Sequence, residues 1–236
     1  MKKNFELRSV FKLLSVSLLA VIFLAACNKD DDDFVPVPQA QLMAFNLAVD
    51  QPAVGFTLSG NQLGNIPLGY SSYTGRYLPI FLGSRELRSF DFNTGSTIAI
   101  SQNTFADSTF YSAFLLGYDG NYKHVVVEDD YDQVTPVSGM AWVRYINAIA
   151  DSTLSPQIDI GTVDDNSTYG TVSAFRQVNA GPVDVSVSSG GSFDVQRTIE
   201  LVENKIYTIL LIGTPGETDA DKAVQIRFIE NGTATL

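Results

Sequence analysis

The side chains that most often carry out chemistry are scarce in this sequence. It has one histidine, His124, next to the apolar residues 125–127, and one cysteine, Cys27. A zinc site or a Ser-His or Cys-His catalytic pair needs more of these residues than the chain provides. Carboxylates are abundant and two of them could hydrolyse a glycosidic bond, but no pair stands out from the acidic background. We therefore predict a non-enzymatic protein with no catalytic residues, no metal site and no cofactor.

Two groups of residues could bind a ligand. Tyr70, Tyr73 and Tyr77 lie in a loop-like stretch, and aromatic rings on loops can stack on sugars, although tyrosine is also ordinary packing in a β-sandwich. The acidic run at 128–132 could hold calcium between two domains. It lacks the glycine and the spacing of a known calcium loop, so a solvated linker is the better interpretation.

Two short motifs resemble acceptors for O-linked glycans in some bacteria. Ser108 and Ser152 each follow an aspartate and precede a threonine. Matches of three residues arise easily by chance, so glycosylation of these serines stays open.

The N-terminus has the pattern of a secretory signal. Four basic residues precede an apolar stretch at 13–26, which is shorter than the roughly 20 residues of a membrane-spanning helix. The following sequence, Leu24-Ala25-Ala26-Cys27, resembles the lipobox of bacterial lipoproteins. That resemblance implies cleavage before Cys27 and acylation of its thiol and its new amino group. Because two or more acyl chains anchor a protein stably, we expect Cys27 to attach the chain to a membrane.

The residues after Cys27 indicate which membrane surface carries the protein. Lys29 and the four aspartates at 30–33 resemble the signal that sends some lipoproteins to the outer face of the outer membrane. Pro36 and Pro38 favour an extended tether over residues 27–39. We expect a lipid anchor in the outer membrane with the protein facing the cell exterior, in preference to the periplasm.

The charge of the chain excludes some partners. Removal of residues 1–26 takes away four basic residues and one acidic residue, which leaves 11 Lys and Arg against 25 Asp and Glu, a formal charge of −14. An acidic surface repels phosphate backbones and anionic lipid headgroups. We therefore expect no nucleic-acid partner, and contact with the membrane only through the lipid on Cys27.

An internal repeat determines the domain organisation. Three groups of residues recur in the same order in two segments of about a hundred residues each. The shared positions are Asn46 and Asp50 with Asn147 and Asp151, the Tyr-x-x-x-Leu-(Leu/Ile)-Gly-x-x-Gly pattern from Tyr111 and from Tyr207, and residues 126–129 with 228–231. We predict a tandem duplication after a signal peptide at 1–26 and a tether at 27–39, with domains at 40–134 and 138–236.

Each copy has the pattern of an all-β domain. Val183, Val185 and Val187 alternate with polar residues, as in a half-buried strand, and Gly- and Pro-containing turns separate further strand-like runs. About seven short strands per hundred residues without an amphipathic helix favour two tandem immunoglobulin-like antiparallel β-sandwiches. Tyr111 and Tyr207, near the start of the penultimate strand of each copy, are placed to be structural tyrosine corners.

The segment from Leu42 to Gly60 resembles the opening motif of the domain of unknown function family 4397. The matching residues are Asp50, Pro52, Ala53, Val54 and Gly60, and the resemblance extends as two copies over residues 40–236. Members are exported or surface bacterial proteins with β-sandwich folds and no agreed activity. The resemblance therefore implies a surface binding, adhesion or structural module with a protein or glycan partner. The alternative is an accessory glycan-binding lipoprotein of a nutrient-uptake complex.

Overall fold

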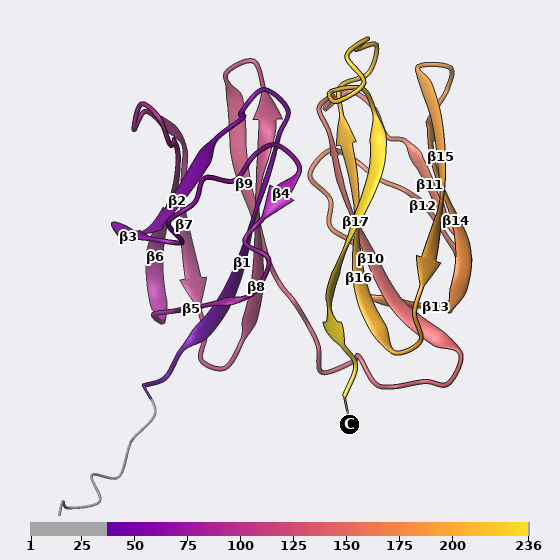
Figure 1. Ribbon diagram of the computed structural model, residues 1–236, viewed down its shortest axis with the longest axis horizontal. Helices are drawn as coiled ribbons and strands as arrows, with labels where there is room; N and C mark the ends of the chain where they lie inside the picture. Colours follow the sequence, from indigo (N-terminus) through magenta and orange to yellow (C-terminus); the bar gives the residue numbers. More distant parts are fainter. Residues whose placement is uncertain (1–36, 236) are drawn as a thin grey trace, which may run out of the picture. The chain divides into compact units, whose positions relative to one another are not determined.

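The computed structural model describes residues 37–235, and within this range it contains strands and turns but no helix (Figure 1). The signal peptide, Cys27 and most of the predicted tether lie outside the described residues. The prediction of an all-β protein built from sandwiches is confirmed.

The strands of the first copy form two sheets. They are β1 (Ala40–Ala48), β2 (Val54–Leu58), β3 (Asn61–Gln62), β4 (Ser72–Tyr73), β5 (Leu78–Ile80), β6 (Gly83–Asp91), β7 (Thr97–Phe105), β8 (Phe110–Tyr118) and β9 (Asn121–Glu128). Outer sheet 1 has the order β3-β2-β6-β7. Inner sheet 1 has the order β4-β1-β8-β9, and β5 pairs with the start of β1.

The strands of the second copy repeat this plan. They are β10 (Met140–Ile149), β11 (Gln157–Ile160), β12 (Val163–Asn166), β13 (Arg176–Asn179), β14 (Gly181–Ser189), β15 (Phe193–Leu201), β16 (Lys205–Gly213) and β17 (Gln225–Thr233). Outer sheet 2 has the order β12-β11-β14-β15 and inner sheet 2 has the order β13-β10-β16-β17.

Each inner sheet contains one parallel pair, so the sandwiches are not purely antiparallel as predicted. β1 pairs in parallel with β8, and β10 with β16, in matching registers that place Tyr111 beside Leu42 and Tyr207 beside Val143. Two parallel strands need a long crossover connection. In each copy this connection includes the strands of the outer sheet. The first strand therefore lies beside the penultimate strand, whereas the immunoglobulin order places it beside the second.

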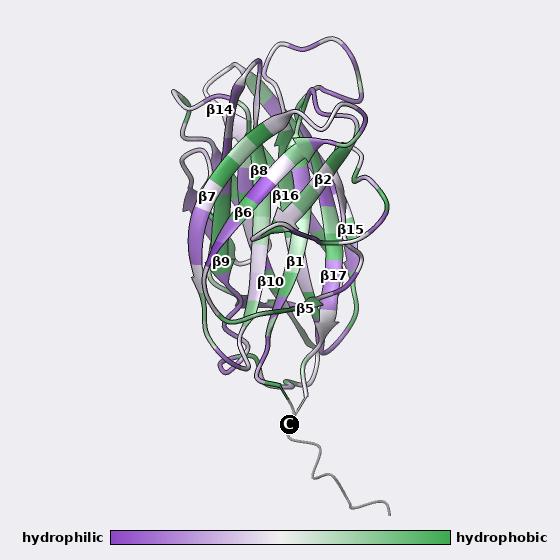
Figure 2. Cartoon of the chain, turned by 90° about the vertical axis from the view of Figure 1, so that its left-hand side faces the viewer, coloured by the Kyte–Doolittle hydropathy of each residue, from purple (hydrophilic) through white to green (hydrophobic). Residues whose placement is uncertain are grey.

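The inner sheets are buried on both faces. One face of each packs on its own outer sheet, which gives each sandwich a core. The other faces pack on each other through a third cluster that includes Phe45, Phe114, Ile146 and Leu210 (Figure 1). Burial on both faces explains why β1, β8, β10 and β16 are nearly continuous apolar runs. Strands of the outer sheets instead alternate hydrophilic and hydrophobic residues (Figure 2).

In each copy a buried asparagine holds the segment that returns from the outer to the inner sheet. We call this the crossing segment; it spans residues 63–71 in the first copy and 167–175 in the second. Asn46 Nδ2 donates hydrogen bonds to the carbonyl oxygens of Gln51 and Leu68, at 2.7 and 3.0 Å. Asn147 Nδ2 donates to the carbonyl of Ser167 at 2.8 Å. Each Oδ1 accepts from the backbone N–H two residues later. The repeated asparagine in the sequence therefore has the same structural role in both copies.

Candidate functional site

A buried ion pair joins the two copies. The side chains of Arg144 on β10 and Asp129 after β9 are 2% and 0% exposed, and Arg144 Nη1 donates to Asp129 Oδ1. Arg144 also donates to Ser112 Oγ at 2.8 Å and to Thr208 Oγ1 at 3.0 Å. Its guanidinium carbon lies 4.6 Å from the ring centroid of Phe175. The guanidinium is thus held by partners from both copies and closed off from solvent.

Two tyrosine hydroxyls complete this network. Tyr77 donates to Asp129 Oδ2, which also accepts from Ser112 Oγ at 2.7 Å, and the hydroxyl of Tyr131 lies against that of Tyr77. Burial raises the pKa of Tyr77 well above its usual value, and the charge of Asp129 raises it further. Burial and Asp129 also raise the pKa of Tyr131 to about 12. Both phenols are therefore neutral donors at physiological pH, and the network serves as a structural joint.

The three tyrosines predicted to form a ligand platform do not form one. Tyr70, Tyr73 and Tyr77 are half-buried against the cluster between the inner sheets. Tyr73 stacks on Phe45 with ring centroids 5.4 Å apart, and the hydroxyl of Tyr77 lies in the ion-pair network. Sequence spacing could not predict this, because the rings pack on residues that are distant in the sequence, such as Phe45 for Tyr73 and Asp129 for Tyr77.

Two residues of the acidic run at 128–132, Asp129 and Tyr131, are docked on the protein, whereas Glu128, Asp130 and Asp132 are exposed, as a solvated linker would be. Asp129 pairs with Arg144, and the Tyr131 ring stacks on Phe175 with centroids 5.5 Å apart. Across residues 37–235, no three His, Cys, Asp or Glu side chains converge as metal ligands would. One of the four carboxylates in the calcium hypothesis, that of Asp129, therefore has a cationic partner already.

Tyr111 and Tyr207 have the geometry of corner tyrosines. The hydroxyl of Tyr111 accepts a hydrogen bond from the backbone N–H of Ala106, and the hydroxyl of Tyr207 accepts one from Val202, both at 3.1 Å. Each bond reaches five residues upstream, across the corner where the chain passes from the outer to the inner sheet. Both rings are buried, at 7% and 3% exposure, so they face no ligand.

His124 lies inside the first sandwich. Its Nδ1 is 3.0 Å from Ser101 Oγ and its Nε2 is 3.0 Å from Ser89 Oγ. Burial lowers the pKa of His124 to about 4. The imidazole is therefore neutral at physiological pH and links β9 to β6 and β7.

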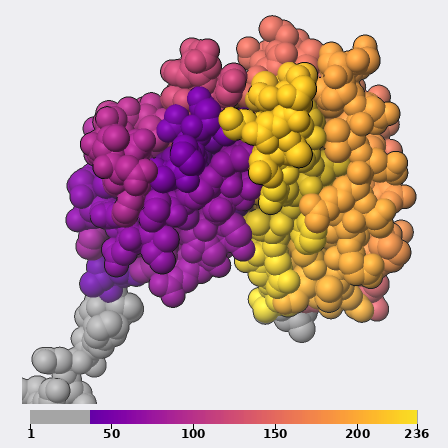
Figure 3. All heavy atoms as spheres, turned by 45° about the horizontal axis from the view of Figure 1, so that its top comes forward, coloured from indigo at the N-terminus to yellow at the C-terminus, as the bar shows by residue number. Residues whose placement is uncertain are grey.

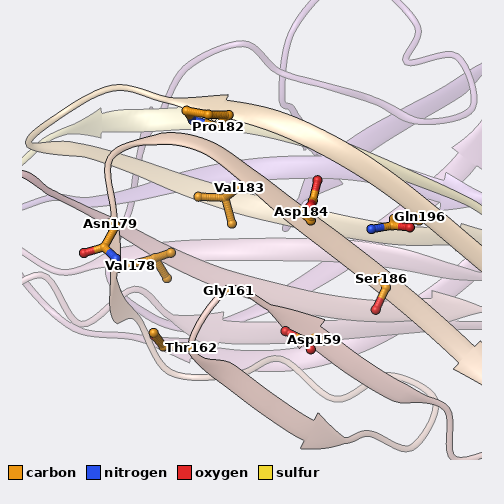
Figure 4. Close-up of a pocket in the computed structure, with 10 residues that line it drawn as sticks. All are labelled: Asp159, Gly161, Thr162, Val178, Asn179, Pro182, Val183, Asp184, Ser186 and Gln196. Carbon is orange, nitrogen blue, oxygen red and sulfur yellow. The ribbon is translucent and has the colours of Figure 1, made fainter.

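A shallow hollow of about 440 Å³ lies on the exposed face of outer sheet 2 (Figure 4). Asp159, Asp184, Ser186 and Gln196 line it from neighbouring strands. Thr198 Oγ1 donates to Asp184 Oδ1 at 2.6 Å. No lysine or arginine lines the hollow, so it presents hydrogen-bond acceptors and negative charge.

A second groove lies where the two copies meet, and its volume is about 390 Å³. The turn between β8 and β9 contributes Tyr118, Asp119 and Asn121 from the first copy. The second copy contributes four residues from the loop after β10 and the crossing segment: Ala150, Asp151, Ser152 and Tyr169. Figure 3 shows the turn and the loop side by side at the upper edge of the molecule. We call this site the distal groove.

The distal groove combines exposed and supported side chains. Tyr118 is 38% exposed, while Tyr169 is half-buried and Lys123 Nζ lies 4.4 Å from its ring centroid. Asp119 has a φ of +50°, and its backbone N–H donates to Asp50 Oδ2 at 3.0 Å. Asp151 Oδ1 accepts from the backbone N–H and the hydroxyl of Thr153. The turn and the loop are thus held in shape by hydrogen bonds of their own.

Sequence reasoning missed both sites at the contact between the copies. The sequence offered one signal for Arg144: it is a charged residue within the largely apolar run 141–147. The groove residues are distant in the sequence, and the motifs that contain Asp151 and Ser152 do not connect them to Tyr118, Asp119 or Asn121, so no signal marked them as one site. Ser152, singled out as a glycan acceptor, lines the groove, and Ser108 lies on an exposed turn with a φ of +57°.

Comparisons with known proteins do not place the chain in a family. No family model and no curated protein matches the chain. A solved structure from Bacteroides uniformis ATCC 8492, described as a "putative cell adhesion protein", is 8% identical, with 82% of this chain and 98% of that chain covered and a TM-score of 0.22. One from Bacteroides eggerthii DSM 20697 with the same description is 12% identical, with 84% and 97% covered and a TM-score of 0.24. Values this low carry no functional argument.

The described residues also bear on membrane association. Between residues 37 and 235, no helix has the length and apolar character needed to cross a membrane.

Proposed function

We propose that this chain is a lipid-anchored surface protein that acts as a non-enzymatic binding or adhesion module. The observation that carries the proposal is the burial of the two inner sheets against each other. Their contact cluster and the Arg144–Asp129 pair make the two copies one compact unit from Pro38 onward. The outer sheets and the loops at the strand ends are then the surfaces left for a partner.

The N-terminal sequence supports the surface location within this proposal. Acylation of Cys27 anchors the chain in the outer membrane, and Lys29 with the aspartates at 30–33 directs it to the exterior. The resemblance of residues 40–236 to a family of exported β-sandwich domains of unknown function supports the same assignment. Tyr70, Tyr73 and Tyr77 give the glycan-binding alternative little support, because they are half-buried against the cluster between the inner sheets.

Labelling and cell-surface exposure test the proposal. Cells that express the full chain are grown with a radiolabelled fatty acid and then treated with a protease that does not cross the outer membrane. We expect label on the wild type, none on Cys27→Ala, and protease digestion of the wild type on intact cells. A wild type that carries no label, or that is digested only after lysis, would contradict the location.

Adhesion is measured on the same cells. We expect a strain that lacks the protein to bind less well to host-derived or bacterial surfaces, with restoration by the wild type and not by Cys27→Ala. Equal binding by all three strains to every surface would argue against an adhesion role. A protein partner would then be sought by cross-linking on intact cells, and finding none would leave the binding role without support.

A further inference from the structure

The distal groove lies at the end of the fold opposite the point where the tether joins. The chain enters β1 at Ala40, and the last paired residue of β1, Ala48, lies beside Gly117 near the end of the parallel strand β8. Tyr118 follows directly, so a whole strand of nine residues, about 30 Å at 3.3 Å per residue, separates the groove from that entry point.

The chemistry of the groove favours a neutral ligand that is rich in hydroxyl groups. Asp119, Asp151, Asn121 and Ser152 present carboxylate, amide and hydroxyl groups, which accept and donate hydrogen bonds. Tyr118 adds an exposed ring that can cover the apolar face of a sugar. Binding sites commonly combine a few polar groups with aromatic surface at a domain boundary, with volumes of about 300–1,000 Å³.

The charges around the groove exclude an anionic ligand and disfavour a cationic one. Asp119 and Asp151 line the groove, and Asp50 lies beneath the turn, bonded to the Asp119 N–H. These carboxylates repel anions. The neighbouring cation, Lys123, already occupies the ring face of Tyr169, where a cationic ligand would otherwise gain most. A neutral saccharide avoids both problems.

From these observations we infer that the distal groove is a binding site for a neutral glycan. In this site Tyr118 stacks on a sugar ring, while Asp119, Asn121 and Asp151 hydrogen-bond its hydroxyls. The site is distinct from the tyrosines at 70–77, and both copies of the repeat are needed to form it. This inference rests on the proposed binding function and names the ligand class of that function.

A glycan array tests the inference on the mature chain with Cys27→Ser, which removes the lipid and leaves every described residue unchanged. The array contains neutral and anionic glycans, and a lysine-rich peptide is tested beside it. Neutral glycans that bind are then titrated by calorimetry. We expect binding to at least one neutral glycan and at least tenfold weaker binding to its anionic relatives and to the peptide.

Four variants locate the site. Tyr118→Ala and Asp119→Asn should each weaken binding about tenfold, because each removes one main contact worth about 1.4 kcal/mol. Phe81→Ala removes another exposed aromatic ring, and Asp184→Asn alters a carboxylate in the hollow on outer sheet 2. These two controls should leave affinity within twofold. All four variants should keep the melting temperature of the parent.

Three results would overturn the inference. They are an absence of binding to any neutral glycan, preferred binding of the anionic glycans or the peptide, and glycan binding that Tyr118→Ala leaves unchanged. The proposed function fails separately, because it depends on surface exposure and adhesion of the full chain. If cells with Tyr118→Ala adhere as well as the wild type, the adhesion role stands and the groove is not its site.

Discussion

The two copies differ in charge where they face each other. At equivalent positions the first copy has Met43, Ser112 and Asp129, and the second has Arg144, Thr208 and Asn231. Within each copy the same bond recurs: Ser112 Oγ donates to Asp129 Oδ2, and Thr208 Oγ1 donates to Asn231 Oδ1, both at 2.7 Å. Only the charges break the symmetry of these two sets.

This difference shows how a duplicated surface becomes a specific contact. Arg144 donates to Thr208 in its own copy and to Ser112 and Asp129 in the other copy. A second arginine at the position of Met43 would have Asn231 and not a carboxylate in the equivalent place. One arginine and one aspartate therefore suffice to form the contact. Each charge is buried next to the opposite charge, which compensates for its lost hydration.

The largest effect is expected when the second copy is made like the first. Arg144→Met leaves Asp129 buried with hydroxyl donors but without a cation, which should lower the free energy of unfolding by about 3–5 kcal/mol. Chemical denaturation of the mature chain measures this loss. Asp129→Asn in the same chain removes the unpaired charge, so the double variant should recover part of the stability. A double variant less stable than Arg144→Met alone would contradict this explanation.

A smaller difference lies inside the two sandwiches. His124 on β9 is bonded to Ser89 and Ser101, whereas the equivalent position on β17 is Ile226, which is 3% exposed. The folded state lowers the pKa of His124 from 6.5 to about 4. Between these pH values the unfolded chain binds a proton at this site and the folded chain does not. The stability due to neutral His124 is therefore lost as the pH falls from 6.5 towards 4.

The pH dependence of unfolding tests this difference. The shift corresponds to about 3 kcal/mol when the proton is fully bound in both states. Carboxylates titrate in the same range, so the useful quantity is the difference between the wild type and His124→Gln. We expect that difference to change by about 3 kcal/mol between pH 7 and pH 4. A constant difference would show that His124 is protonated equally easily in the folded and unfolded chains.

The sequence predicted strands well where pattern and packing agree. The alternation of Val183, Val185 and Val187 with polar residues predicts a half-buried strand, and these valines lie in β14 with their side chains buried. β12, with the sequence Val-Asp-Asp-Asn, was missed because aspartate and asparagine disfavour strands, and only its pairing with β11 extends it. The parallel pairing was also missed, because alternation of residue types does not specify the neighbouring strand.

The candidate sites were less predictable, for a physical reason. Tyr111 and Tyr207 have local partners five residues away, so a sequence motif suffices to predict their contacts. Arg144 bonds residues of the other copy, and the hydroxyl of Tyr77 bonds Asp129, so these contacts depend on how complete sheets and distant segments pack. The sequence showed that a duplication exists, but not which faces of the copies meet.

A repeated glycine offers a comparison in which both copies should respond alike. Gly117 and Gly213 have φ values of +143° and +109°. A Cβ atom on them would lie 2.3 Å from the carbonyl oxygen of Asn121 and 2.2 Å from that of Ala223. Alanine at either position should lower the free energy of unfolding by about 2–3 kcal/mol, as expected for a strained backbone.

The nearby glycines Gly120 and Gly216 are the matched controls. They also have positive φ, but a Cβ atom on them would meet no atom within 4 Å. Alanine there should cost only the left-handed strain, about 1 kcal/mol. Equal losses at all four glycines in denaturation would mean that the close approach of the backbone contributes nothing.

The smallest effect is expected at the two corner tyrosines. Tyr111→Phe and Tyr207→Phe each remove one hydroxyl and leave the backbone N–H of Ala106 or Val202 without its acceptor. Each should lower the free energy of unfolding by about 1 kcal/mol, since the ring and its packing remain. Because the sites lie in different sandwiches and share no partner, the double variant should lose the sum of the two single losses. A double loss well below that sum would show that the two corners are coupled through the packed inner sheets.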